Sequence, residues 1–144
     1  MAPVDRHISA PEIAPYEPTD SEEYMNPAQK EHFRKILREW QRQLQESVTQ
    51  TVSHMKDDSG SYPDPTDRAT QEEGFALELR TRDRERKLLR KIQDTLTLID
   101  NDEYGYCESC GVDIGLRRLE ARPTATLCID CKTVQELQEK RQAR

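Results

Sequence analysis

Two long stretches of the chain carry apolar residues at helical spacing. Such spacing, with an apolar residue every three or four positions, is typical of a helix with one buried face. The first series is Phe33, Ile36, Leu37, Trp40, Leu44, Val48, Val52 and Met55, and the second is Phe75, Leu79, Leu89, Ile92, Leu96 and Ile99. Each apolar stripe needs an apolar partner. In the second series the last four residues are spaced by three, four and three positions, as in the heptad repeat of a coiled coil. We therefore predict an antiparallel coiled-coil hairpin over residues 26–102.

Local signals set the ends of the two helices. Asn26 fits an N-cap, Pro27 the first helical position and Gln29 the third position of a capping box. A glycine and two prolines then separate the helices, and Asp64 is the expected cap of the second. At 1.5 Å of rise per residue, arms of about thirty residues reach roughly 45 Å. The turn, which we call the tip and place at about residues 59–68, should therefore lie far from the rest of the chain.

The segments on either side of the hairpin are less regular. Residues 1–25 hold four prolines and no helical or strand period, which predicts a mostly irregular tail. The residues able to dock part of this tail are Ile8, Ile13 and Tyr16. For residues 133–144 we predict a short helix, because Val134 and Leu137 lie on one side of it. We expect this side to pack back on the base. We call residues 103–132, which lie between the hairpin and this helix, the base.

Composition supports an elongated, mainly α-helical protein with a thin core. The 144 residues are 33% hydrophobic and 35% charged, whereas ordinary domains have about 45–50% apolar and 25% charged residues. The net charge of −6 argues against a general DNA-binding protein. No stretch has the length of a membrane span or the apolar core of a signal peptide, so we expect a cytoplasmic protein with reduced cysteines.

Four cysteines predict a zinc site in the base. Cys107 and Cys110 form one Cys-x-x-Cys pair, and seventeen residues later Cys128 and Cys131 form another. Four thiolates at this spacing close a tetrahedron around Zn²⁺ and leave no position for water, so one structural zinc is expected. Gly111 suits the tight turn after the first pair. A redox dithiol of the thioredoxin type is the alternative, but it needs a βαβ setting that the sequence lacks.

Charge along the hairpin is uneven. Residues 57–73, around the tip, contain six acidic residues and one basic residue. Within this group Asp64 and Asp67 suit either a helix N-terminus or a functional acid that approaches a metal ion or basic residues in a partner. Residues 78–91 contain seven basic and three acidic residues, which form either a solvated helix face or a surface for an acidic partner. Three scattered histidines suggest no catalytic set, so an enzyme is not expected.

Several of these stretches together resemble the DksA/TraR family of bacterial transcription factors. They are Glu22–Asn26, Tyr62–Ala69, Leu79–Lys87, Gly105–Gly111 and Arg117–Lys132. The sequence Pro-Asp-Pro-x-Asp-Arg-Ala joined to this zinc segment is far more specific than a Cys₄ pattern alone. The four cysteines resemble the zinc-containing branch of the family. Thr81 departs from the family, which has asparagine at this position.

The resemblance implies a monomeric, non-enzymatic regulator that binds RNA polymerase without reading DNA sequence. Its hairpin would enter the secondary channel of polymerase, with Asp64, Asp67 and Ala69 as the functional tip residues. It would alter open-complex stability in the stringent response, repressing rRNA promoters and activating amino-acid biosynthesis promoters. The resemblance also implies binding of the alarmone ppGpp between this protein and polymerase. The matching positions are Arg84, Leu88, Lys91, Arg122 and Lys132.

Two other functions stay open at this point. A Gre-type factor also inserts an acidic tip into the secondary channel, where it stimulates transcript cleavage, although the zinc base argues against that family. A zinc-ribbon DNA-binding protein would place basic and aromatic residues around the cysteines, and Arg117, Arg118 and Arg122 are the basic candidates for such a surface.

Overall fold

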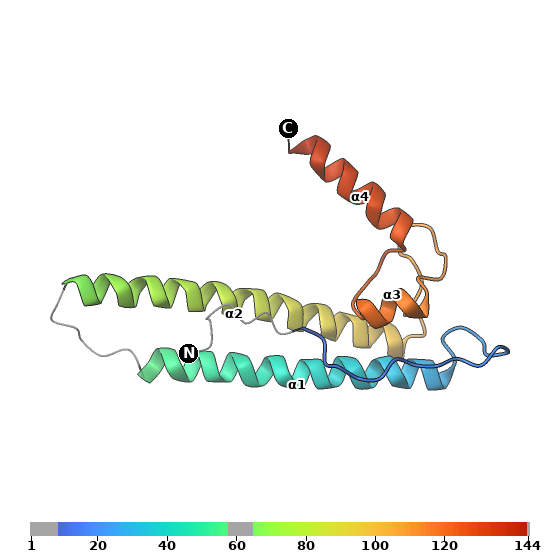
Figure 1. Cartoon of the computed structure of the whole chain (residues 1–144), viewed down its shortest axis with the longest axis horizontal. Helices are drawn as coiled ribbons and strands as arrows, with labels where there is room; N and C mark the ends of the chain where they lie inside the picture. Colours follow the sequence, from blue (N-terminus) through green and yellow to red (C-terminus); the bar gives the residue numbers. More distant parts are fainter. Residues whose placement is uncertain (1–8, 58–64, 144) are drawn as a thin grey trace.

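A computed structural model describes residues 9–57 and 65–143. Within these ranges the chain forms four helices: α1 (Pro27–Asp57), α2 (Pro65–Asp100), α3 (Leu116–Ala121) and α4 (Ile129–Gln142). Helices α1 and α2 lie antiparallel as a long hairpin, and α3 and α4 follow at one end of it (Figure 1). The described residues contain no strand beyond an isolated bridge between Tyr106 and Asp113. The predicted fold class, a helical hairpin with a cysteine-bearing base, is confirmed.

The predicted start of α1 is confirmed by its capping bonds. The Asn26 side-chain oxygen accepts a hydrogen bond of 2.8 Å from the backbone N–H of Gln29. The Gln29 side chain in turn accepts from the backbone N–H of Met25 at 2.7 Å, one residue earlier than in the usual capping box. Helix α2 begins at Pro65, as predicted, whereas its expected cap, Asp64, lies outside the described residues.

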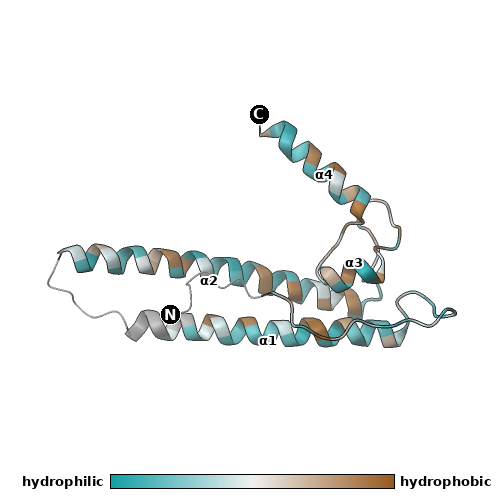
Figure 2. Ribbon diagram, in the orientation of Figure 1, coloured by the Kyte–Doolittle hydropathy of each residue, from teal (hydrophilic) through white to brown (hydrophobic). Residues whose placement is uncertain are grey.

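The apolar core occupies the end of the hairpin that adjoins the base. Phe33, Leu37 and Leu44 of α1 and Ile92 and Ile99 of α2 are at most 1% exposed. Burying an aliphatic or aromatic side chain of this size contributes about 1.5–3 kcal/mol. Hydrophilic residues predominate along the hairpin, and hydrophobic ones gather where its helices meet α3 (Figure 2). The side chains of Val52 and Met55, also predicted in the stripe, lie outside the described part of the chain.

Toward the tip the seam of α2 becomes polar, which corrects one prediction. Leu79, expected in the apolar stripe, is 45% exposed. The residues from Leu89 to Ile99 that face α1 are three or four positions apart. The same spacing, extended toward the start of α2, reaches Glu85 and Glu78 and not Leu79, which therefore lies outside the buried face. Glu85 is only 6% exposed, and its carboxylate accepts a hydrogen bond of 2.9 Å from the Ser47 hydroxyl.

The helix near the C-terminus corrects a second prediction. Helix α4 begins at Ile129, inside the segment assigned to the base, because Cys128 serves as its N-cap. It has no buried residue, and Val134 and Leu137 are 54% and 55% exposed. It extends away from the hairpin (Figure 1), so the expected packing on the base is wrong. No helix in the described ranges has the apolar length needed to cross a bilayer.

The irregular N-terminal tail docks on the folded part of the chain. Ile13 packs against the core, and the Tyr16 ring lies 5.7 Å from the ring of His32. The backbone N–H of Tyr16 also donates to the Glu120 carboxylate of α3 at 2.9 Å. The expectation of docking through Ile13 and Tyr16 is thus confirmed, while Ile8 lies outside the described residues.

Two tyrosines join the base to the hairpin and the tail. Tyr104 is 2% exposed, its ring lies 5.6 Å from that of Phe33, and its hydroxyl donates to the Pro123 carbonyl at 2.7 Å. The Tyr24 hydroxyl donates to the carbonyl of Gly105 at 2.7 Å and accepts from the N–H of Gly115 at 3.0 Å. These contacts fix the position of the loop that bears the first cysteine pair.

Candidate metal centre and adjoining cavities

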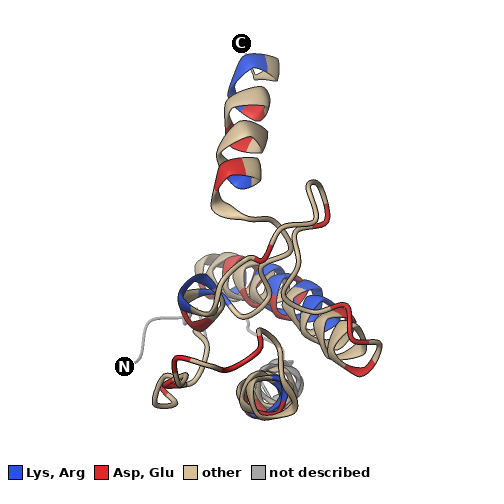
Figure 3. Ribbon diagram, turned by 90° about the vertical axis from the view of Figure 1, so that its right-hand side faces the viewer, with Lys and Arg blue, Asp and Glu red and all other residues tan. Residues whose placement is uncertain are grey.

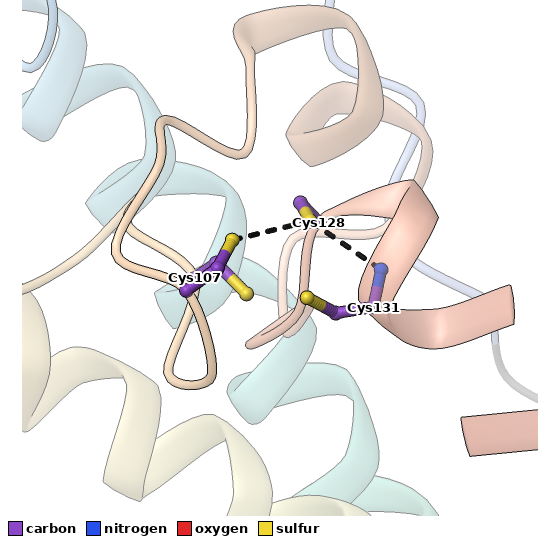
Figure 4. Close-up of side chains that lie close together, drawn as sticks. Cys107, Cys128 and Cys131 are labelled. Atoms are coloured by element: carbon purple, nitrogen blue, oxygen red, sulfur yellow. Dashed lines mark hydrogen bonds between the residues drawn. The ribbon is translucent and has the colours of Figure 1, made fainter. Parts of the chain in front are cut away.

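Each cysteine pair lies on a tight backbone turn. The N–H of Cys107 donates to the Val112 carbonyl at 2.8 Å, and the N–H of Gly111 donates back to the Cys107 carbonyl at 2.9 Å. Gly111 has φ of 79°, a left-handed conformation that favours glycine, as the sequence predicts. In the second pair the Cys128 sulfur accepts from the N–H of Cys131 at 3.5 Å (Figure 4). That pair opens α4, and the positive end of the helix dipole favours thiolates there.

The four sulfurs fit a zinc ion. All four Sγ atoms lie within 4.8 Å of one another, and those of Cys110 and Cys128 are 3.7 Å apart. A tetrahedral ion with zinc–sulfur bonds of about 2.3 Å needs sulfur–sulfur distances of about 3.8 Å. Both the donor atoms and their spacing therefore suit Zn²⁺, and four protein ligands make such a site structural.

Protons are unevenly shared among these thiols. The pKa of Cys107 is lowered to about 6, chiefly because the backbone N–H of Cys128 donates a hydrogen bond to its sulfur. Hydrogen bonding with the Cys128 sulfur raises the pKa of Cys131 to about 12. A divalent cation held by the four cysteines would take the place of the shared protons, because thiolates are the form that binds metal.

Two cavities lie between the hairpin and the base. The hairpin cavity, of about 830 Å³, is lined by α1, α2, the segment of α3 with the residues after it, and the N-terminal tail. The base cavity, of about 520 Å³, is lined by α2, the base and one face of α4 from Lys132 to Glu139. Four of the five residues matched to ppGpp binding line the hairpin cavity: Arg84, Leu88, Lys91 and Arg122. Lys132 lines the base cavity, which shares Lys91 and Arg122 with the first.

The hairpin cavity is amphipathic. Its cationic residues are Arg84, Lys87, Lys91, Arg118 and Arg122, and Glu85 is the one acidic residue among its described lining. Trp40, Leu44 and Leu88 contribute apolar surface. Lysine and arginine residues are visible along α2 and on α3 beside it (Figure 3). An apolar surface with several cations suits a ligand that joins a flat ring to phosphate groups.

Some lining residues were missed by the sequence reasoning. Lys87 is a helical neighbour of Arg84 and Lys91, so the spacing of three and four residues on α2 was a signal that could have found it. Trp40 belongs to α1 and Arg118 to α3, and no local pattern connects them with α2. Thr81, the departure from the family, also lines this cavity, and its hydroxyl lies 3.5 Å from the Arg84 guanidinium.

The tip residues are remote from both cavities. Asp67 lies in the first turn of α2, and Asp67 and Ala69 are both exposed. Asp64 lies outside the described residues. Helix α2 begins at the end of the hairpin opposite α3, so the structure does not bring Asp67 near the cysteines (Figure 1).

Two known protein families match consecutive parts of the chain. Residues 29–99 match the family described as the N-terminal domain of the DnaK suppressor protein DksA. Residues 102–137 match the prokaryotic dksA/traR C4-type zinc finger. The second match contains all four cysteines.

Individual relatives match over most of the chain. The RNA polymerase-binding transcription factor DksA of Escherichia coli strain K12 is 60% identical over 91% of this chain and 87% of its own length. The protein of the same name from Haemophilus influenzae is 59% identical over 91% of this chain and 90% of its own. The solved structure of transcription factor DksA2 from Pseudomonas aeruginosa has a TM-score of 0.76 and 41% identity, and the match covers 81% of this chain and 90% of that one. The chain therefore belongs to the DksA/TraR family.

Proposed function

We propose that this protein is a non-enzymatic transcription regulator that binds RNA polymerase, inserts its tip into the secondary channel and alters open-complex stability together with ppGpp. The observation that carries the proposal is a long hairpin whose exposed acidic end lies away from a cysteine-bearing base, in a chain closely similar to RNA polymerase-binding DksA proteins. A probe of this shape delivers charge into a deep channel while its base stays outside. The protein acts as a monomer and reads no DNA sequence.

The tip acts through its negative charge. Asp67 is exposed in the first turn of α2, where its carboxylate is compatible with the helix dipole and remains available to a partner. In a channel that excludes water, a carboxylate interacts with basic side chains or metal ions much more strongly than it does in bulk solvent. Asp64 and Ala69 complete the proposed tip site.

The alarmone binds where the two cavities adjoin. Arg84, Lys91, Arg122 and Lys132 supply cations for its phosphates, and Leu88 supplies apolar surface. Because Lys91 and Arg122 line both cavities, one ligand reaches the cations of both. Polymerase closes the site from the outside, so ppGpp increases the effect of the protein on promoter complexes.

The zinc ion has a structural role. Cys107, Cys110, Cys128 and Cys131 would hold one Zn²⁺, which ties the start of α4 to the loop that Tyr104 and Tyr24 fix against the hairpin. An ion bound there would also hold Lys132, which directly follows the ligand Cys131, beside Lys91 and Arg122. The zinc-ribbon alternative is not favoured because both parts of the chain match DksA/TraR families.

Run-off transcription tests the proposal. Reactions contain purified polymerase, an rRNA promoter or an amino-acid biosynthesis promoter, and this protein with or without ppGpp. We expect less rRNA product, shorter-lived open complexes on that promoter, and a larger effect with ppGpp. Asp67→Asn should remove the effect while leaving polymerase binding intact, whereas Asp83→Asn, on an exposed part of the same helix, serves as the matched control. No change by the wild-type protein on either promoter would refute the proposal.

Two further measurements separate the parts of the proposal. Lys91→Ala should reduce the ppGpp-dependent effect more than the basal effect, while Lys35→Ala, exposed on α1, should reduce neither. Equal loss of both effects in Lys91→Ala would count against the ligand site. Strong stimulation of transcript cleavage on backtracked complexes would instead favour a Gre-type factor.

A further inference from the structure

The N-terminal tail reaches the hairpin cavity. Ser9 and Ala10 line this cavity together with residues of α1, α2 and α3. Ala10 is half-buried and packs against the apolar core, so the segment rests on the protein and is not simply near it. In Figure 1 the dark blue part of the tail runs across the hairpin toward the base. None of the residues matched to ppGpp binding comes from this segment.

The same tail contacts the element that supplies part of the cationic lining. The Glu120 carboxylate of α3 accepts from the Tyr16 backbone N–H at 2.9 Å and lies 2.7 Å from Nε2 of His32. Arg122 lies two positions after Glu120 and lines both cavities. The Tyr16 hydroxyl donates to the Glu22 carboxylate at 2.7 Å, which holds the next part of the tail in place. A docked tail therefore both borders the cavity and restrains the helix that precedes Arg122.

We propose that Ser9 and Ala10 form a wall of the nucleotide site and set its affinity for a phosphorylated nucleotide such as ppGpp. The inference rests on the proposed function of the cavity. Ser9 and Ala10 are small and uncharged, so they border the cavity without opposing its cations. Because binding equilibria are reciprocal, a ligand that contacts this wall stabilises the docked tail, and a docked tail tightens ligand binding.

Charge placed on the wall tests the proposal in the full-length protein. In the run-off assay with polymerase, the ppGpp concentration that gives half of the maximal effect is measured for Ala10→Asp, Ala10→Arg and Ala14→Asp. Ala14 is exposed on the same tail and is not among the cavity lining, so it provides a matched control. A carboxylate in the wall repels the phosphates, and we expect Ala10→Asp to raise this concentration roughly fivefold. Ala10→Arg should lower it, and Ala14→Asp should leave it unchanged.

The opposite shifts expected for Ala10→Asp and Ala10→Arg distinguish direct contact of the wall with the ligand from an effect of the substitutions on tail docking. If Ala10→Asp and Ala10→Arg shift the concentration in the same direction, the tail acts through docking alone and the wall is refuted. The wall is also refuted if Ala10→Asp behaves as Ala14→Asp does while the wild-type protein responds to ppGpp. A wild-type protein without any ppGpp response would refute the proposed ligand function itself, and this inference with it.

Discussion

Tyr104 connects the base with the hairpin, because its buried ring packs against Phe33 of α1. Burial raises its pKa, and its hydroxyl is committed to the Pro123 carbonyl. Tyr104→Phe removes this donor and leaves a buried carbonyl unsatisfied, so we expect the free energy of unfolding to fall by about 1–2 kcal/mol. Urea unfolding measures the change. Tyr106→Phe is the control because Tyr106 is 39% exposed, and a similar loss in both variants would contradict this role for Tyr104.

The contribution of Glu22 to the stability of the docked tail should depend on pH. Hydrogen bonds from the Tyr16 hydroxyl, the Thr19 backbone and the Gln29 amide lower its pKa from 4.5 to about 2, with the Tyr16 bond the largest cause. A carboxyl group with a lower pKa in the folded state stabilises that state above the unfolded pKa. This stabilisation should be lost as the pH falls from about 4.5 toward about 2.

Thermal unfolding between pH 2 and pH 6 tests this behaviour. Glu22→Gln should unfold at lower temperature than the wild type at pH 6, and this difference should shrink as the pH falls. Glu23→Gln, at an exposed neighbouring position, should follow the wild-type profile. A constant difference between Glu22→Gln and the wild type across the range would show that the charge of Glu22 is not what matters.

At the scale of the helices, the hairpin has a well-packed half and a polar half. Ile92 and Ile99 are buried near the base, whereas Glu85 occupies the seam farther along and Leu77 and Leu79 are exposed. Segments with few buried apolar contacts open locally at low free-energy cost. We therefore expect backbone amides of residues 70–80 to exchange at least about tenfold faster than those of residues 90–99. Hydrogen exchange followed by mass spectrometry measures both segments, and uniform protection along α2 would contradict the prediction.

Local patterns predicted the helices better than they predicted which faces are buried. The start of α1 depends on Asn26 and Gln29, which lie within one helical turn, so sequence alone located it. The burial of Glu85 in place of Leu79 depends on the register between two helices, which composition does not reveal. The start of α4 was placed too late because Cys128 acts as a helix cap, a role in which cysteine is uncommon.

Of the candidate sites, the metal site could be predicted from local sequence, whereas the full lining of the hairpin cavity could not. The Cys-x-x-Cys spacing is local, so the cluster of four sulfurs was predictable from sequence. The hairpin cavity joins α2 to Trp40 on α1 and to Ala10 in the tail, and these contacts exist only after the chain has folded. Family resemblance supplied Arg84 and Lys91 but gave no indication that the tail lies beside them.

For the whole molecule, bound metal should stabilise the fold of the base more than that of the hairpin. A metal ion bound by the four cysteines would join the loop that bears Cys107 and Cys110 to the start of α4. We expect one zinc per chain, and chelation should lower the unfolding temperature by about 10 °C or more. Circular dichroism after chelation should retain most of the helical signal because α1 and α2 are the longest helices. Cys131→Ser should reproduce this state, and complete loss of helical signal in either case would contradict it.

The grouping of the cysteines also makes the protein convenient for spectroscopy. All four cysteines of the chain belong to one cluster of sulfurs, where bound zinc would protect them from alkylation. A cysteine introduced at an exposed position of α2, such as Thr66, would then be the one thiol available to a maleimide dye or spin label. Distances from such a label to sites on polymerase would test whether the hairpin enters the secondary channel, with every native cysteine left in place.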